Sequence, residues 1–348
     1  MSGMRQTVLI WGAGAIGGII GAHLVRAGRP VAFVDTAAEH VEQMARHGLA
    51  IEGPLGGLSV AAETVTPDRL AGSFGTVLLA VKSQHTEAAC RAILPHLAEG
   101  GCVVSCQNGL NEPAISGIVG RQRTVGAFVN FAGDYLAPGR ITYGLRGMVA
   151  IGELDGCVTP RIGSLRDLLA LFEPGVVVSD NIFGFLWGKA SYAAVLSASA
   201  LTNQPIADFI GDPARRHLAT CLVQETLNVA MADGVEPLGF DTFEPWAFVK
   251  RDAAAIGASL DALASFNRGT GKTHSGIWRD LAVRRRRTEV AAQFAPIQDA
   301  ARRHGLALPL TNRLMALIDA IEDDRREQGE LLADELGALA AETYPSLR

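Results

Sequence analysis

The chain has 348 residues, a length that suggests two domains with a substantial buried core. Hydrophobic residues make up 48% and charged residues 19%, a composition that argues against intrinsic disorder. The formal net charge of -5, without an extended basic tail, argues against a nucleic-acid partner.

The first half of the chain alternates between strand-like and helix-like segments. Short apolar runs typical of buried parallel strands recur along it, at residues 7–11, 31–34, 76–81, 102–106 and 124–131. Helical patterns cover residues 16–27, 37–47, 86–97 and 160–172. Residues 50–65 are typical of a hairpin, residues 140–153 of paired strands and residues 176–179 of a short last strand. The alternation predicts an α/β domain with a mainly parallel sheet over residues 1–180.

After about residue 180 the pattern becomes helical. Helices are expected over residues 183–201, 215–231, 277–304, 314–325 and 331–341. Residues 244–266 are expected to form one or two further helices, and no run stands out as a strand. We therefore expect an all-helical second domain over residues 181–348.

Cysteine usage and the apolar runs indicate the compartment. The five cysteines are irregularly spaced and form neither a CxxC pair nor a metal-binding pattern: Cys90, Cys102, Cys106, Cys157 and Cys221. We expect reduced thiols and no metal site. Residues 1–6 have no signal-peptide layout, and no apolar run reaches the roughly 18 residues that span a bilayer. These features predict a cytoplasmic protein without a membrane partner.

Four consecutive arginines, Arg284–Arg287, form a local basic run. On a helix, four successive residues cover about 300° of the circumference and cannot form one stripe. We therefore expect a solvated helix surface in preference to an anion site.

The sequence G-x-G-x-x-G directly follows the first predicted strand and opens the first predicted helix, which is the context required for a dinucleotide site. Gly12 permits the tight turn, Gly14 lets the backbone approach a pyrophosphate, and Gly17 lets helix and strand pack closely. Ala15 and Ile16 fall in the first helical turn, where free N–H groups and the helix dipole favour phosphate. The alternative is a tight strand–helix turn without a ligand.

An acidic residue, Asp35, ends the second predicted strand, 18 residues after Gly17. A carboxylate there accepts hydrogen bonds from the adenosine ribose hydroxyls and repels a 2′-phosphate. This favours NAD as the cofactor, with NADP as the alternative. Asp35 also precedes a helix, so it is a candidate N-cap, and both roles are compatible.

Separated segments share their order and spacing with one enzyme family: GAGAIGG at 12–18, AVKS at 80–83, QNG at 107–109, LWGKA at 186–190, and RRTEV at 286–290 followed by HGLALP at 304–309. On these segments, nearly the whole chain resembles the ketopantoate reductase (2-dehydropantoate 2-reductase) family. The resemblance implies a Rossmann dinucleotide-binding domain, a helical C-terminal domain and an active site between them. In that family NAD(P)H reduces a 2-keto acid to a D-2-hydroxy acid, in pantothenate biosynthesis.

The resemblance also implies roles for individual residues. Lys189 corresponds to the catalytic lysine of the family and Glu289 to its active-site glutamate. Asn108 corresponds to an asparagine near nicotinamide and substrate, and Lys82 to a lysine close to the cofactor. Lys189 would supply the cation and the proton that a developing alkoxide needs.

Without the resemblance, each of these residues has a structural alternative. Lys189 is then a lysine with its stem packed at an interface, and Glu289 an ion-pair partner of the arginines before it. Asn108 is a turn residue before Gly109, and Lys82 an exposed lysine at a strand end.

The chain departs from the family where substrate is recognised. The family places asparagines four and eight residues after the catalytic lysine, where this chain has Ala193 and Ser197. Ser197 stays a candidate substrate residue, and the loss of two amides favours a substrate other than ketopantoate.

The segment 273–280 also differs from the family and has one extra residue before Glu289. Ser275 is the best counterpart of the family's substrate-binding serine. His274, Trp278 and Arg279 are candidates for an aromatic wall and a carboxylate clamp. The alternatives are a helix core for Trp278 and solvent exposure for Arg279.

These observations predict an oxidoreductase that transfers hydride between NAD(P)H and a small 2-keto acid, with 2-dehydropantoate to pantoate as the family default. An NAD-dependent D-2-hydroxy-acid dehydrogenase for an aromatic or branched side chain is the first alternative. A non-catalytic dinucleotide sensor is the second, and the pairing of Lys189 with Glu289 argues against it. The helical domain offers surface for a homodimer.

Overall fold

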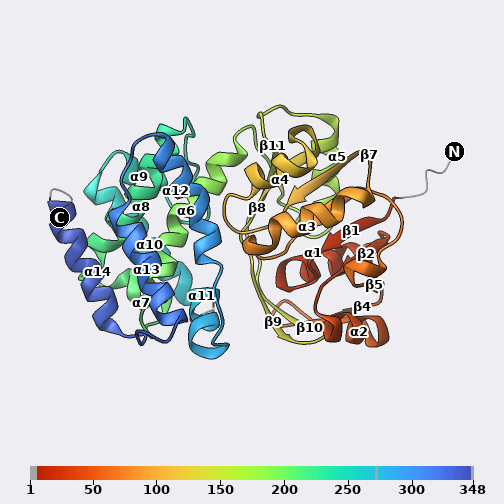
Figure 1. The fold of residues 1–348 in the computed structure, drawn as a ribbon, viewed down its shortest axis with the longest axis horizontal. Coiled ribbons are helices and arrows are strands. Elements are labelled where there is room, and N and C mark those ends of the chain that lie inside the picture. Colours follow the sequence, from red (N-terminus) through yellow and green to blue (C-terminus); the bar gives the residue numbers. More distant parts are fainter. Residues whose placement is uncertain (1–5, 271–272, 346–348) are drawn as a thin grey trace. The chain divides into compact units, whose positions relative to one another are not determined.

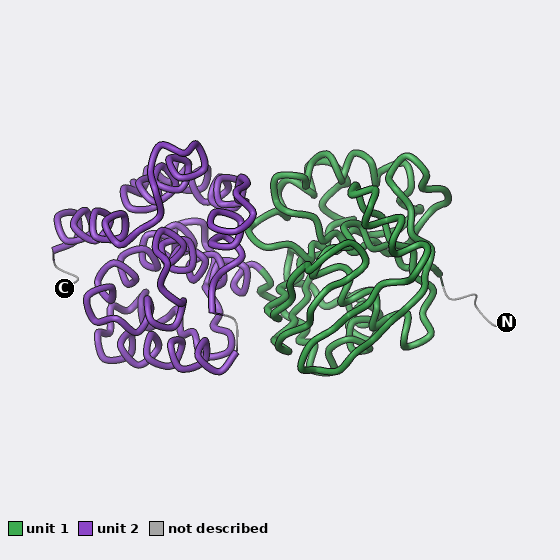
Figure 2. The backbone as a smooth tube through the Cα atoms, turned by 90° about the horizontal axis from the view of Figure 1, so that it is seen from below, with its two compact units in different colours: residues 1–182 green, residues 183–348 purple. Residues whose placement is uncertain are grey.

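The computed structural model describes residues 6–270 and 273–345. The chain forms two compact units, residues 1–182 and 183–348 (Figure 2). The division falls two residues after the boundary expected from the change in sequence pattern. The expectation that residues 1–6 lack a signal-peptide layout concerns a segment that lies, apart from residue 6, outside the described part.

The first unit is built on an eight-stranded sheet with the order β12-β11-β8-β7-β6-β1-β2-β5. Its strands are β1 (Val8–Trp11), β2 (Val31–Val34), β5 (Glu63–Val65), β6 (Phe74–Leu79), β7 (Leu97–Ser105), β8 (Thr124–Val129), β11 (Val149–Glu153) and β12 (Val177–Val178). Neighbouring strands are parallel, apart from the antiparallel pair of β8 and β11. The sheet confirms the predicted α/β class.

Helices cover both faces of this sheet (Figure 1). They are α1 (Ala15–Arg26), α2 (Ala38–His47), α3 (Thr86–Ile93), α4 (Glu112–Val119) and α5 (Pro160–Leu169). Side chains alternate along a strand, so Val8 and Ile10 pack with α1 and α5, whereas Leu9 and Trp11 pack with α3 and α4. Burial on both faces explains why the strands read as continuous apolar runs.

A second, four-stranded sheet of order β4-β3-β10-β9 lies beside α1 and α2 (Figure 1). Its strands are β3 (Leu49–Glu52), β4 (Leu58–Val60), β9 (Ala132–Ala137) and β10 (Arg140–Leu145). The prediction that residues 140–153 pair with each other is wrong, because β10 pairs with β9 and β3, and β11 pairs with β8. The connection needs Gly147, where a Cβ would lie 1.7 Å from the Asn130 carbonyl oxygen.

The second unit is helical, as predicted. It contains α6 (Ile182–Ser199), α7 (Ile206–Gly211), α8 (Arg216–Ala232), α9 (Pro245–Val249), α10 (Ala253–Gly269), α11 (Gly276–Trp278), α12 (Val290–Arg303), α13 (Pro309–Glu322) and α14 (Glu330–Thr343). Within its described residues, β structure is limited to an isolated bridge between Phe240 and Phe243.

The predicted single helix over residues 277–304 is wrong. A π-helical turn, Arg279–Val283, follows α11, and the chain leaves helical geometry before α12 begins. Arg285 has a φ of +45°, a left-handed conformation that ends a helix. A π turn closes its hydrogen bonds over one residue more than an α-helical turn does, so it changes the helical period at this point of the chain.

Candidate functional site

The glycine-rich turn joins β1 to α1, and two of its glycines are required by packing. Gly12 has a φ of +98°, and a Cβ there would lie 2.9 Å from the carbonyl carbon of Ala80. A Cβ on Gly17 would lie 2.1 Å from the Gly12 carbonyl oxygen. At Gly14, by contrast, no atom of the described residues outside the adjoining backbone lies within 4 Å of the position that a Cβ would take. The turn therefore leaves open space above Gly14, where a diphosphate fits.

The start of α1 faces this open space with its own N–H groups. Gly14 is the N-cap residue, and no side chain in the described ranges caps the helix there. Ala15 and Ile16 open the first turn, whose N–H groups have no partner within the helix. The positive end of the helix dipole adds to these donors, so the residues present suit an anionic diphosphate.

Asp35 follows β2 and binds two backbone amides at once. One carboxylate oxygen accepts from the N–H of Ala13 at 2.9 Å, and the other accepts from the N–H of Ala37 at 2.9 Å. The N-cap residue of α2 is Ala37, so the expectation that Asp35 is the N-cap is wrong by two positions. Each carboxylate oxygen accepts more than one hydrogen bond, so Asp35 keeps capacity for ribose hydroxyls.

Lys82 and Asn108 follow the neighbouring strands β6 and β7, on segments that are bonded to each other. The hydroxyl of Ser83 donates to the Asn108 carbonyl oxygen at 2.7 Å, and the Gln107 amide donates to the Val81 carbonyl oxygen at 2.9 Å. Strands β1, β6 and β7 are adjacent and parallel. The glycine turn, Lys82 and Asn108 thus share the carboxyl edge of the sheet, where such folds bind ligands.

A buried carboxyl group, which the sequence pattern did not reveal, lies close to the Asn108 segment. Glu112 is the first residue of α4 and has no exposed surface. Burial raises its pKa to about 7, against the opposing effect of the Ser105 hydroxyl and nearby N–H groups. Burial and the Glu112 charge also raise the pKa of the Cys106 thiol to about 12, so this cysteine stays protonated. An acid in a first helical turn is usual, which hides Glu112 in the sequence.

In the second unit, Lys189 lies on α6, which is otherwise mostly buried. Beyond Phe183, the half-buried residues of this helix are Lys189, Ala193 and Leu196. Their spacing of four and three places them on one stripe. Ala193 thus lies one turn from Lys189 and adds only a methyl group to that stripe.

Ser197, the predicted substrate residue on α6, faces away from solvent. It is fully buried, and its hydroxyl donates to the Ala193 carbonyl oxygen at 2.8 Å. This bond within α6 occupies its hydrogen atom. We therefore leave Ser197 out of the substrate site proposed below.

Ser275 is the N-cap of α11, where its hydroxyl oxygen accepts from the Trp278 N–H at 3.1 Å. The rings of His274 and Trp278 stack, with centroids 3.9 Å apart. Both rings bond to Asn203: the Trp278 indole N–H to its side-chain oxygen and His274 Nε2 to its carbonyl oxygen, each at 3.2 Å. The aromatic pair is thereby fixed to the loop that follows α6, and Trp278 is half-buried and not in a helix core.

Glu289 occupies the N-cap position of α12 and is half-buried, and its side chain makes no capping hydrogen bond. Thr288 caps instead, because its hydroxyl oxygen accepts from the Val290 N–H at 3.2 Å. The carboxylate of Glu289 is therefore not committed to the helix start.

The preceding arginines are largely solvated, as expected, since Arg285, Arg286 and Arg287 are exposed, but the run is not helical. Asp280, which is 3% exposed, binds Arg284 at 3.1 Å and Arg286 at 2.9 Å, and Arg287 binds Glu322 at 3.1 Å. These ion pairs fold the run into the break between the π turn and α12.

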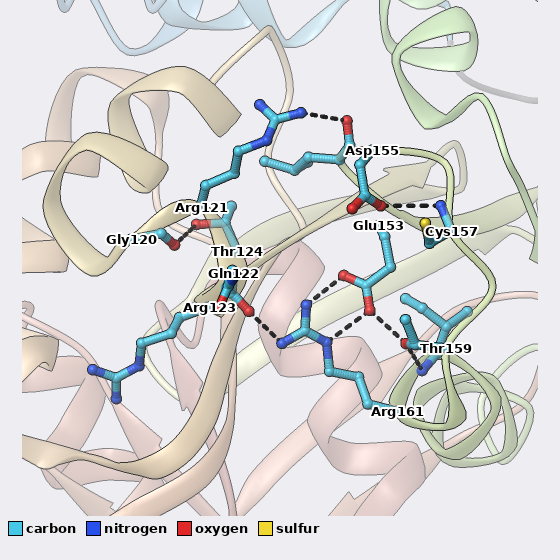
Figure 3. Close-up of polar contacts among 12 residues, drawn as sticks. Gly120, Arg121, Gln122, Arg123, Thr124, Glu153, Asp155, Cys157, Thr159 and Arg161 are labelled. Atoms are coloured by element: carbon cyan, nitrogen blue, oxygen red, sulfur yellow. Dashed lines mark hydrogen bonds and ion pairs between the residues drawn. The ribbon is translucent and has the colours of Figure 1, made fainter.

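A cavity of about 650 Å³ lies elsewhere in the first unit, and Arg121, Glu153 and Arg161 are among the residues that line it. Figure 3 shows Glu153 accepting hydrogen bonds from Arg161 and from Thr159, the latter at 2.6 Å. Glu153 ends β11 opposite Val125, near the start of β8, so the cavity lies at the amino edge of the sheet. Ligands of such sheets bind at the carboxyl edge, and we do not assign the cavity to the dinucleotide.

Three negative findings apply to the described residues. None of their helices is long and apolar enough to cross a membrane. They contain no group of three or more His, Cys, Asp or Glu side chains placed to hold a metal ion. The five cysteines, all within the described ranges, form no disulfide.

Comparison with known proteins gives consistent matches over both units. A family model described as ketopantoate reductase PanE/ApbA matches residues 8–156, and one described as ketopantoate reductase PanE/ApbA C terminal matches residues 181–322. A 2-dehydropantoate 2-reductase of Mesorhizobium japonicum is 27% identical over 266 residues, which cover 67% of this chain and 79% of that protein.

Solved structures of similar proteins agree with the family match. A PanE/ApbA family ketopantoate reductase from Ralstonia eutropha JMP134 is similar with a TM-score of 0.76 and 26% identity, over 92% of this chain and 99% of that one. A D-mandelate dehydrogenase, solved with NADH and anilino(oxo)acetate, has a TM-score of 0.80 at 21% identity, also over 92% and 99%. At that identity the second likeness concerns the fold. The matches confirm the predicted fold, a Rossmann domain followed by a helical domain.

Proposed function

The chain belongs to the ketopantoate reductase family of oxidoreductases, and from this premise we propose that it reduces a small 2-keto acid to a D-2-hydroxy acid. The family default is the reduction of 2-dehydropantoate to pantoate. The observation that carries the proposal is the open glycine turn at the carboxyl edge of the sheet, in a chain whose α6 presents Lys189 on its half-buried stripe. We propose a cytoplasmic enzyme that works as a homodimer.

We propose NAD as the preferred cofactor, with NADP as the alternative. Asp35 supports this choice, because its carboxylate is fixed by two N–H groups at the end of β2. A fixed negative charge there accepts ribose hydroxyls and repels a 2′-phosphate. Lys82 and Asn108, on bonded segments of the same edge, would line the nicotinamide end of the site.

The residues of the second unit would handle the substrate. When bound, the reduced nicotinamide supplies a hydride for the carbonyl carbon. Lys189 would stabilise the negative charge on the carbonyl oxygen and donate the proton that completes the alcohol. Glu289, whose carboxylate does not cap α12, would orient Lys189 or accept a substrate hydroxyl. Ser275 would contact the substrate carboxylate or hydroxyl.

The first experiment is a parallel measurement of initial rates with 2-dehydropantoate and either NADH or NADPH. Fast turnover supports the family default, and the better cofactor tests the role of Asp35. No turnover by folded protein that still binds NADH would exclude the default substrate. Lys189→Ala should abolish turnover and leave NADH affinity within about twofold, since the lysine acts on the substrate. Retained turnover would remove Lys189 from the mechanism.

A second candidate substrate class has an aromatic or branched side chain. Two observations favour it: Ala193 leaves the stripe beside Lys189 without a hydrogen-bonding side chain, and the stacked His274–Trp278 pair adjoins Ser275. Phenylglyoxylate and 2-dehydropantoate should be compared by kcat/KM. A higher value for phenylglyoxylate, reduced by Trp278→Ala, supports this class. A higher value for 2-dehydropantoate rejects it.

A dinucleotide sensor without catalysis is the remaining alternative. It predicts that NADH binds and that no 2-keto acid is reduced. A panel of 2-keto acids of different side chains, tested on wild type and Lys189→Ala, separates the two: any turnover that depends on Lys189 excludes the sensor.

A further inference from the structure

Ala13, inside the glycine-rich turn, is held at both of its backbone polar atoms. Its N–H donates to the Asp35 carboxylate at 2.9 Å. Its carbonyl oxygen accepts a hydrogen bond from His40 Nε2 at 3.0 Å. His40 lies on α2, 27 residues further along the chain, and is 1% exposed. A buried side chain outside the motif thus contacts the turn that binds the diphosphate.

The other ring nitrogen of His40 has its own fixed partner. Gly139, in the turn between β9 and β10, donates its N–H to His40 Nδ1 at 2.9 Å. Since a peptide N–H only donates, Nδ1 must be an acceptor, and the ring proton must be on Nε2, facing Ala13. The ring is therefore neutral in a single tautomer, and it packs edge-on against Tyr135, with centroids 5.1 Å apart.

The partner turn is itself rigidly placed. Gly139 has a φ of +73°, and its carbonyl oxygen accepts from the Ala50 N–H of β3 at 2.9 Å. The small sheet thereby fixes Gly139, Gly139 fixes the ring of His40, and His40 fixes Ala13. Gly18 leaves room for the Ala13 carbonyl group, because a Cβ at Gly18 would lie 2.9 Å from the Ala13 carbonyl oxygen.

We propose that His40 is a positioning residue for the dinucleotide, which fixes the Ala13 carbonyl and so aims the first N–H groups of α1 at the diphosphate. Gly12 and Gly14 flank Ala13, and glycines leave a backbone mobile unless outside contacts restrain it. A turn that is restrained before binding loses less conformational entropy when the ligand arrives. The inference rests on the proposed dinucleotide function.

Two substitutions separate the two hydrogen bonds of His40. His40→Gln reaches the position of Nε2 with an amide N–H and keeps a donor for Ala13. His40→Asn keeps an acceptor near the position of Nδ1 for Gly139 and loses the donor. His23→Asn is the matched control, because His23 is also buried in the first unit but bonds within α1, to the Ile19 carbonyl oxygen at 2.8 Å.

The readout is the Kd for NADH, measured by fluorescence titration, together with hydrogen exchange of the turn amides in the ligand-free protein. We expect His40→Asn to raise Kd about tenfold and to speed turn exchange, the effect of one lost buried hydrogen bond. His40→Gln should stay within about threefold of wild type, and His23→Asn within about twofold despite any loss of stability. The proposal would be overturned if wild type and His40→Asn had equal Kd values for NADH. It would also be overturned if His40→Asn and His40→Gln weakened NADH binding equally.

The wild-type protein supplies a test that does not depend on a variant folding. Imidazole NMR should show His40 at neutral pH with its proton on Nε2 and an unprotonated Nδ1, and NADH should slow exchange of that proton. A proton on Nδ1 overturns the inference. If the wild type binds no dinucleotide, the proposed function fails. If it binds and His40→Asn binds equally, only the role of His40 fails.

Discussion

Replacing Glu112 by glutamine should make the stability of the protein less dependent on pH between 4.5 and about 7. Burial raises the pKa of the Glu112 carboxyl from 4.5 to about 7. The folded state therefore holds a proton that the unfolded state releases between these pH values, and stability falls as pH rises through that window. A shift from 4.5 to about 7 corresponds to about 3 kcal/mol of unfolding free energy. Glutamine does not titrate and avoids this loss.

The assay is urea unfolding of wild type and Glu112→Gln at a series of pH values on both sides of 7. The difference in unfolding free energy should grow by about 3 kcal/mol in favour of the variant as pH rises from 4.5 through 7. Glu87→Gln is the control, since Glu87 also lies in a first helical turn but is exposed. An exposed ion pair contributes little, so this variant should follow wild type at every pH.

Parallel pH curves for wild type and Glu112→Gln would refute the reasoning, because they would show that folding does not raise the pKa of Glu112. Infrared spectroscopy gives an independent reading. The wild type below pH 7 should show the C=O stretch of a buried carboxylic acid, and that band should be missing from the variant.

Other substitutions test the remaining features. Asp35→Ala should raise the Kd for NADH at least about tenfold and reduce discrimination against NADPH, since the ribose acceptor is lost; titration with both dinucleotides measures this, and an unchanged Kd ratio contradicts the NAD preference. Glu225→Ala should lower the unfolding free energy by about 3 kcal/mol, because the buried carboxylate accepts from the Leu310 N–H at the start of α13 and from three further donors. Urea unfolding checks it, and a loss below about 1 kcal/mol would show that water replaces these bonds. Asp280→Asn should raise KM more than it lowers kcat, because it weakens the ion pairs that hold the arginine run before Glu289. Unchanged steady-state kinetics would show that the segment between α11 and α12 is rigid without these ion pairs.

The sequence predicts the strands of the large sheet well, since each buried parallel strand carries its own apolar run. The sequence predicts less well which strands pair with each other. Residues 140–153 alternate as strands do, but alternation does not say which strand lies beside which, and β10 and β11 joined different sheets. The short helices α4 and α7 were not predicted, because α4 contains a proline and a glycine and the six residues of α7 are too few to show a helical period.

Among the site residues too, those in a local motif were predicted and those that depend on tertiary contacts were not. Gly12, Gly14, Gly17 and Asp35 were predicted because the dinucleotide site is a local strand–turn–helix motif with a fixed spacing. The break between α11 and α12 was missed, because its cause is a set of ion pairs to Asp280 that a helical pattern conceals. Contacts of this kind depend on tertiary structure and leave no periodic signal.

The small four-stranded sheet helps to restrain the glycine-rich turn between β1 and α1. Close approach of backbone to a diphosphate requires glycine, and glycine leaves the free backbone disordered at a cost in binding entropy. Here the residue between two glycines is held from one side by the carboxylate after β2 and from the other by His40, whose ring is locked by the β9–β10 turn. The turn can therefore expose its N–H groups and still be ordered before the ligand binds. The Asp35 carboxylate and the His40 imidazole thus hold the two peptide groups on either side of the Ala13 Cα, so substitutions at the two positions should not be additive in the Kd for NADH.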